Sequence, residues 1–130
     1  MAIRVVQLGS PRAPAEGLRL GTVRRPPRGV RKEDYARRDY FDLWLPELAP
    51  SPALVKSALA PSLTPAGWAR FARKYRQEMR APAAQRLLVL LAALSSVTNL
   101  SVGCYCADES RCHRSVLRDM LKESGASIAR

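Results

Sequence analysis

Hydrophobic and polar positions along the chain predict strands separated by helices. Short apolar runs of strand type cover residues 3–8, 18–23 and 100–105. The first run ends in a Gly-Ser-Pro turn and the second in an Arg- and Pro-rich turn, and turns of this kind terminate strands. A further apolar stretch over residues 40–45 is aromatic, and it is typical of a short strand or a buried loop.

Apolar residues at helical spacing predict the helical segments. Ser51-Pro52 and Thr64-Pro65 each combine an N-cap residue with proline at the first helical position. The second of these helices is amphipathic, whereas the helix that begins at Pro82 has almost no polar face, so we expect it to be buried against the sheet. A last helix follows residue 112 and ends near Gly125, and residues 33–38 are compatible with a short helix.

Strands separated by helices predict an α/β fold: a single compact domain over residues 1–130, with a small, mostly parallel sheet flanked by helices. Only about ten residues join the first two predicted strands, which is short for a parallel crossover and leaves an antiparallel pair open. About 75 residues and several helices separate the second and third strands, which favours a parallel arrangement.

The chemically reactive residues are concentrated in residues 102–114, which contain all three cysteines and the only histidine. Cys104 and Cys106 share a face if the strand continues, and Cys112 lies where the last helix begins, a position that favours a thiolate. We expect Cys104, Cys112 and His113 to be catalytic, either cysteine as nucleophile or the two as a reversible disulfide. Ligand binding is expected from four neighbours, of which the two acids would also handle protons: Cys106, Asp108, Glu109 and Arg114.

A second group of candidate ligand-binding residues, Arg24, Arg25 and Arg28, follows the second predicted strand. Ligands of open α/β sheets bind outside the carboxyl ends of the strands. If the second and third strands are parallel, these arginines emerge at the same edge as the cysteines. The sequence therefore predicts a site that holds an anion beside a thiol.

Other interpretations of the cysteine segment remain open. Cys104, Cys106, Cys112 and His113 have the ligand types of a zinc site, although the spacing is unusual for one. The helix start could bind an anion with the cysteines only filling space, or the cluster could be purely structural.

The net charge is +11, and only four of the 22 basic residues are lysine. This excess of arginine favours an anionic partner. Guanidinium groups suit phosphate and carboxylate, but an arginine-rich surface can equally be solvated without a partner. Our first hypothesis is a small thiol-dependent, enzyme-like protein that binds an anionic, phosphate-bearing ligand. The alternatives are a non-catalytic nucleic-acid-binding protein, which would use the basic turn and the helix over residues 64–80, and a Cys3His zinc protein.

Neither a secretion signal nor an apolar run of membrane-spanning length is present in the sequence, and three cysteines is an odd number for a disulfide scaffold. We therefore expect a cytoplasmic protein without membrane association. No cofactor is indicated, and the sequence does not specify an oligomeric state or a substrate.

Three segments together carry a family resemblance: Gly21–Gly29, Trp44–Ser51, and the Val102-Gly103-Cys104 and Cys112-His113-Arg114-Ser115 pair. They resemble domain of unknown function family 488, which includes the YeaO-like proteins. The resemblance implies a compact α/β fold and an unassigned activity, with cysteines that hint at an enzyme. Many members have a glutamate two residues after the first cysteine. Here Cys106 occupies that place, and Asp108 or Glu109 is the candidate substitute.

Overall fold

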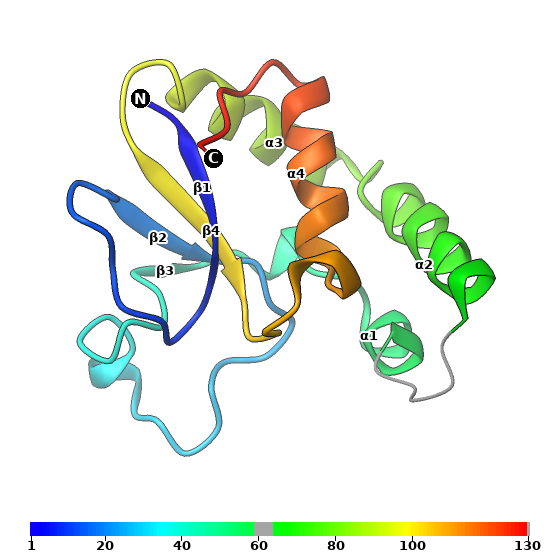
Figure 1. The fold of residues 1–130 in the computed structure, drawn as a ribbon, viewed down its shortest axis with the longest axis horizontal. Coiled ribbons are helices and arrows are strands. Elements are labelled where there is room, and N and C mark those ends of the chain that lie inside the picture. The colour runs from blue at the N-terminus through cyan, green and yellow to red at the C-terminus, as the bar shows by residue number, and fades with distance from the viewer. Residues whose placement is uncertain (59–63, 130) are drawn as a thin grey trace.

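The computed structural model describes residues 1–58 and 64–129, which form an α/β domain in which helices pack beside a small parallel sheet (Figure 1). The strands are β1 (Ile3–Gln7), β2 (Leu18–Gly21), β3 (Leu43–Trp44) and β4 (Leu100–Cys104). The helices are α1 (Pro52–Ala58), α2 (Pro65–Glu78), α3 (Pro82–Leu94) and α4 (His113–Glu123). Short 3₁₀ turns lie at Lys32–Asp34 (η1), Pro46–Leu48 (η2) and Glu109–Arg111 (η3). The predicted fold class is confirmed.

The sheet has the order β1-β4-β2-β3, and every neighbouring pair is parallel. β4 lies between β1 and β2, so the first two strands do not pair with each other, and the antiparallel alternative is wrong. Gln7 of β1 aligns with Cys104, and Gly21 of β2 aligns with Gly103. The carboxyl ends of the strands therefore meet at one edge, as expected for β2 and β4.

The main core lies between the sheet and the helices. All five residues of β4 are buried, and Leu100 and Val102 pack with Leu20 of β2 against apolar residues of the helices. Helix starts occur where the proline signals predict them; at α2 the Thr64 side chain accepts a hydrogen bond from the Gly67 amide at 3.0 Å. None of the described helices has the length and apolarity needed to cross a membrane.

Two local predictions were wrong. α3 is buried on one side only, and the side chains of Val89 and Leu90 on its other side are 61% and 52% exposed. A uniformly apolar helix carries no signal of which side the neighbouring elements cover. The short helix expected over residues 33–38 is reduced to the 3₁₀ turn η1, which is followed by a turn in which Asp39 has positive φ.

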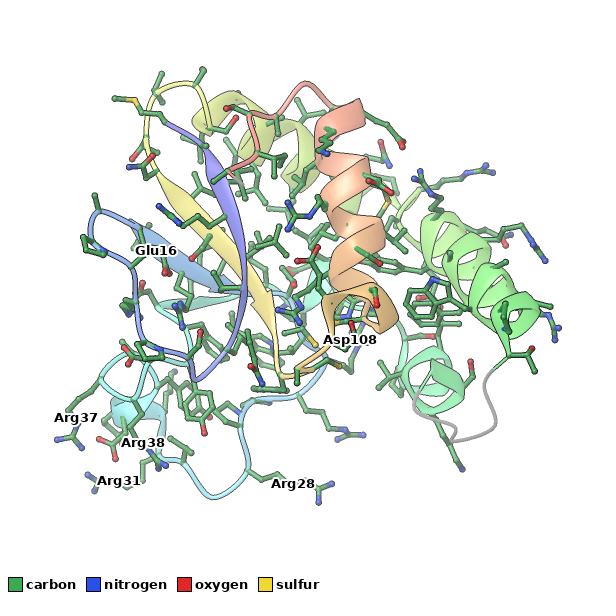
Figure 2. All side chains as sticks on the ribbon, in the orientation of Figure 1. Glu16, Arg28, Arg31, Arg37, Arg38 and Asp108 are labelled. Carbon is green, nitrogen blue, oxygen red and sulfur yellow. The ribbon has the colours of Figure 1, made fainter. Side chains whose placement is uncertain are left out.

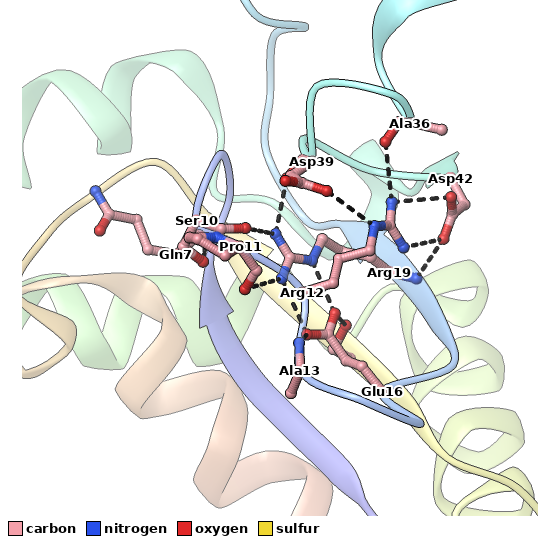
Figure 3. Close-up of polar contacts among 11 residues, drawn as sticks. Gln7, Ser10, Pro11, Arg12, Ala13, Glu16, Arg19, Ala36, Asp39 and Asp42 are labelled. Carbon is pink, nitrogen blue, oxygen red and sulfur yellow. Dashed lines mark hydrogen bonds and ion pairs between the residues drawn. The ribbon is translucent and has the colours of Figure 1, made fainter.

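The face of β2 opposite Leu20 is sealed by a charged network (Figure 3). Arg19 is fully buried and donates to both carboxylate oxygens of Glu16 at 2.8 and 3.0 Å, and to the carbonyls of Ser10 and Asp39. Burial alone would raise the pKa of the Glu16 carboxyl, but hydrogen bonds from Arg19, from Ser101 and from a backbone amide lower it to about 2. This network fixes the loop between β1 and β2 onto the sheet.

Replacing Gly17 with alanine is expected to lower the free energy of unfolding by about 2–3 kcal/mol. Gly17 has a φ of +81°, and an added Cβ would lie 1.9 Å from the backbone oxygen of Asn99. Urea denaturation followed by circular dichroism measures the loss. Gly125, which has positive φ after α4 but no atom near its would-be Cβ, is the matched control. Equal losses at the two positions would contradict the close approach at Gly17.

Candidate functional site

The three cysteine sulfurs gather at the carboxyl edge of the sheet. Cys104 ends β4, Cys106 follows in the loop, and Cys112 is the N-cap residue of α4. Their Sγ atoms all lie within 4.8 Å of one another, and 3.9 Å separates those of Cys104 and Cys106. All three are free thiols, two of them buried and Cys106 half-buried. Strand direction and helix start together therefore place one thiol cluster at the predicted edge.

His113 lies against this cluster. Its Nδ1 is 3.8 Å from Cys112 Sγ, and its Nε2 is 2.7 Å from the backbone oxygen of Thr22. A carbonyl oxygen can only accept, so Nε2 carries the hydrogen, and in the neutral ring Nδ1 is an acceptor that faces the sulfur. Side chains of adjacent helical residues diverge, but Cys112 has an extended backbone (φ −125°, ψ 150°) outside the helix, which permits the contact.

The contacts within the cluster shift the pKa values of the three cysteines in different directions. Hydrogen bonding with the Cys104 thiol lowers the pKa of Cys112, the contact with Cys106 and burial oppose this, and the neighbouring His113 ring lowers the pKa further. The same Cys104 thiol, with Cys112 and the charge of Arg114, lowers the pKa of Cys106. In return, chiefly the contact with Cys106 raises the pKa of Cys104 far above that of a free thiol. Cys104 is therefore the donor of the cluster, and the three thiols titrate as one coupled group.

The thiols line a cavity of about 450 Å³, a volume in the usual range for pockets that bind small ligands. The walls are largely apolar and the charged side chains are all cationic; among the described residues that line the cavity there is no carboxylate. The lining comprises Val23, Arg24, Arg25, Pro50, Pro52, Val55, Lys56, Phe71, Cys104, Tyr105, Cys106, Cys112 and His113.

The three arginines of the basic turn have different positions. The Arg24 guanidinium donates to the carbonyls of Pro50 and Ala49 at 3.1 and 3.0 Å, so it forms part of the wall. Arg25 lines the cavity with an exposed side chain, and its backbone oxygen accepts from the Tyr105 hydroxyl at 2.8 Å. Arg28 is exposed, does not line the cavity, and points outward from the β2–β3 connection (Figure 2).

A family model described as the Active DUF488-N3 subclade matches residues 3–125, nearly the whole chain. The chain belongs to the DUF488 family. This agrees with the resemblance carried by the three sequence segments. No curated protein and no solved structure matches the chain.

The remaining candidate residues of this DUF488 member support the loop around the thiols. Asp108 accepts from the amide and hydroxyl of Ser110 at 3.0 and 2.7 Å. Glu109 forms a two-point ion pair with Arg118 at 2.7 and 2.8 Å. Neither acid lines the cavity. The positions of Asp108 and Glu109 therefore do not support the expected role of these acids in proton transfer.

Arg114 is almost completely buried, and its Nη2 donates to the Cys106 carbonyl at 2.6 Å. Its Nε has no hydrogen-bond partner among the described residues. The guanidinium thus lies beside the thiol loop, where its positive charge favours the Cys106 thiolate.

The structure adds site residues that local sequence patterns did not indicate. Lys56 of α1 and Phe71 of α2 reach the cavity from helices far from the cysteines in sequence, and the Thr22 carbonyl orients His113 from β2's carboxyl end. The Tyr75 ring packs edge-on against the His113 ring, with centroids 5.5 Å apart. Phe71 and Tyr75 lie on the helix for which the sequence indicates only an amphipathic pattern. Thr22 contributes through its backbone carbonyl, which its residue type does not indicate.

The geometry around the thiols of this DUF488 member bears on two interpretations of the sequence, a Cys3His metal site and an activated nucleophile. The three sulfurs form a group compact enough to hold a metal ion, but His113 does not join it. Its two ring nitrogens are directed at the Cys112 sulfur and the Thr22 oxygen. A thiol, an adjacent base and a third group that orients the base are the parts of an activated nucleophile.

Proposed function

We propose that this protein is a thiol-dependent enzyme in which Cys112 attacks an electrophilic centre of a small ligand that carries a phosphate-type anionic group. The observation that carries the proposal is a series of contacts at the wall of a cationic cavity. The Cys112 sulfur contacts His113, and His113 in turn contacts the Thr22 carbonyl. The Cys112 thiolate forms the bond from sulfur to the ligand, and His113 holds the proton that the thiol has given up at Nδ1. His113 gives this proton to the leaving group as that group's bond breaks.

The cavity's surroundings support the anionic part of the proposal. Arg25 follows β2 and Lys56 lies within α1, and both line the cavity with exposed side chains. Among the described residues neither side chain pairs with a carboxylate, so both charges are available to a ligand. Apolar walls formed by Val23, Val55 and Phe71 lower the local dielectric and strengthen such contacts.

Cys104 and Cys106 have supporting roles in this proposal. The Cys104 thiol has one hydrogen to donate, and hydrogen bonding between it and Cys112 favours the Cys112 thiolate. Cys106 lines the same cavity, and in this proposal it contacts the ligand while Cys112 forms the covalent bond.

Inorganic phosphate is expected to slow the reaction of Cys112 with iodoacetamide several-fold, because a bound anion occupies the cavity and repels the thiolate. Mass spectrometry of peptides resolves the label on each cysteine. In the Arg25→Ala/Lys56→Ala variant the protection should disappear. The control is Arg4→Ala/Arg86→Ala, which removes the same charge from exposed residues outside the cavity.

Three outcomes would overturn the proposed function. Protection that survives in the Arg25/Lys56 variant, or that is lost equally in the control, would remove the anion site from the cavity. Stoichiometric zinc in protein purified without chelator would favour the zinc alternative, since a coordinated sulfur is not free to attack a substrate.

A further inference from the structure

We propose that the ligand of the thiol cavity is one nucleotide of a single-stranded nucleic acid, and that the β2–β3 connection binds the phosphates beside it. The inference rests on the proposed function, because it places the nucleotide in the cavity that contains Cys112. It adds the class of substrate and a second binding surface outside the cavity.

The cavity matches the two chemical halves of a nucleotide. Phe71 and Tyr105 contribute aromatic surface, and the remaining wall is aliphatic or proline, which suits a planar base. Arg25 and Lys56 supply exposed cations at the same cavity for a phosphate. A volume of about 450 Å³ holds one such unit and is too small for a longer stretch.

Positive charge continues out of the cavity along the same segment. Residues 24–38 contain seven basic and two acidic residues, a net charge of +5. Figure 2 shows Arg28, Arg31, Arg37 and Arg38 directed outward along this segment. A single small anion would need only the cations of the cavity, whereas a run of cations outside it fits a partner with repeated negative charges.

Few of these cations are neutralised within the protein. Arg31 and Arg37 share one carboxylate, that of Asp34. Among the described residues Arg28 and Arg38 pair with no carboxylate, and the Arg38 guanidinium lies 5.9 Å from the centroid of the Tyr40 ring. This surface therefore combines unpaired guanidiniums with an aromatic ring, which are the groups that bind phosphates and unstacked bases.

A single strand is favoured over a duplex by the shape of the cavity. A base can enter an aromatic-lined pocket only when it has left its stack, and in a single strand most of the free energy of unpairing and unstacking does not have to be supplied. An acidic peptide would use the arginines but not the aromatic wall, and a lipid surface would need an apolar face around the arginines.

Fluorescence anisotropy with a labelled DNA strand of about 12 nucleotides tests the inference on the intact chain. The Arg28→Ala/Arg31→Ala/Arg38→Ala variant should bind the strand at least tenfold more weakly. The slope of log affinity against log salt should fall in size by about 2, because each lost phosphate contact removes about 0.7. The matched control is Arg4→Ala/Arg86→Ala/Lys122→Ala, which removes the same charge from exposed residues outside the segment and the cavity and should change both values much less.

A second arm tests whether a base enters the cavity. A strand of the same length with abasic units should bind about tenfold more weakly than the normal strand, because stacking of the base on the aromatic wall is lost. Circular dichroism melting confirms that each variant is folded.

The inference is overturned if the two triple variants lose affinity equally, if the abasic strand binds as well as the normal one, or if polyglutamate of equal charge binds as tightly as DNA. The last result would point to an acidic protein partner. Binding of the strand is measured on the wild-type protein and does not require Cys112 to react. An unreactive Cys112 with intact strand binding would therefore reject the proposed function alone, and a reactive Cys112 without strand binding would reject this inference alone.

Discussion

Replacing Arg19 with leucine is expected to lower the free energy of unfolding by about 3–5 kcal/mol. Arg19 is fully buried on β2, and removal of its guanidinium leaves the buried Glu16 carboxylate without its ion pair. It also leaves the carbonyls of Ser10 and Asp39, at 2.8 and 2.7 Å from Nη1, without that donor. Urea denaturation of the wild type and the variant, followed by circular dichroism, gives the difference.

Two further variants show whether the loss comes from the buried charge. Arg12→Leu breaks a two-point contact with Asp42 at a partly exposed position, and we expect a cost of no more than about 1 kcal/mol. The double variant Arg19→Leu/Glu16→Leu should be more stable than Arg19→Leu alone, because no unpaired carboxylate stays buried. A double variant that is less stable than the single one would contradict this account of the network.

Replacing His113 with asparagine is expected to slow the alkylation of Cys112 at about pH 7 several-fold. His113 lowers the pKa of Cys112, after the larger effect of the Cys104 thiol. A free thiol with a pKa near 8.5 is only about 3% thiolate at this pH, which bounds the loss. Iodoacetamide labelling resolved by peptide mass spectrometry measures the rate.

The control for this prediction is Tyr75→Phe. Its ring keeps the edge-on contact with His113, while the hydroxyl's hydrogen bond to the Leu48 carbonyl at 2.6 Å is lost. This variant should be less stable by about 1 kcal/mol but should leave the alkylation rate unchanged. If Tyr75→Phe and His113→Asn slowed the reaction equally, packing and not the imidazole would govern the reactivity of the thiol.

The parts of the fold that depend on local chemistry could be predicted from the sequence. The starts of α1, α2 and α3 follow from a proline at the first helical position, and Gly125 follows the end of α4 with positive φ. The edge shared by the basic turn and Cys104 followed from the direction of two strands alone, and the parallel pairing of β2 with β4 confirms it.

Features that depend on distant contacts could not be predicted in this way. The alternation along β2 places Arg19 opposite Leu20, but no local signal shows that the loop before β2 buries that face. Lys56 and Phe71 join the cavity only because α1 and α2 fold back over the carboxyl edge of the sheet. The ring of His113 is oriented by the Thr22 carbonyl, 91 residues away in the sequence.

The roles of the residues at the candidate site stay predictions, but their positions show which of them lie at the cavity and which lie outside it. Cys104, Cys106, Cys112 and His113 are brought together at one cavity. Arg28 lies outside it, so its role in ligand binding now depends on a ligand that extends beyond the cavity.

The central claim is that the thiol cluster holds a reactive thiolate at neutral pH. Its most direct test is the rate of iodoacetamide labelling at each cysteine of the wild-type protein as a function of pH. A Cys112 profile with a midpoint well below about 8.5, while Cys104 reacts only at higher pH, is the result that a hydrogen-bonded cluster beside His113 predicts. A Cys112 midpoint at or above about 8.5 would contradict it and leave three ordinary thiols beside a cationic cavity.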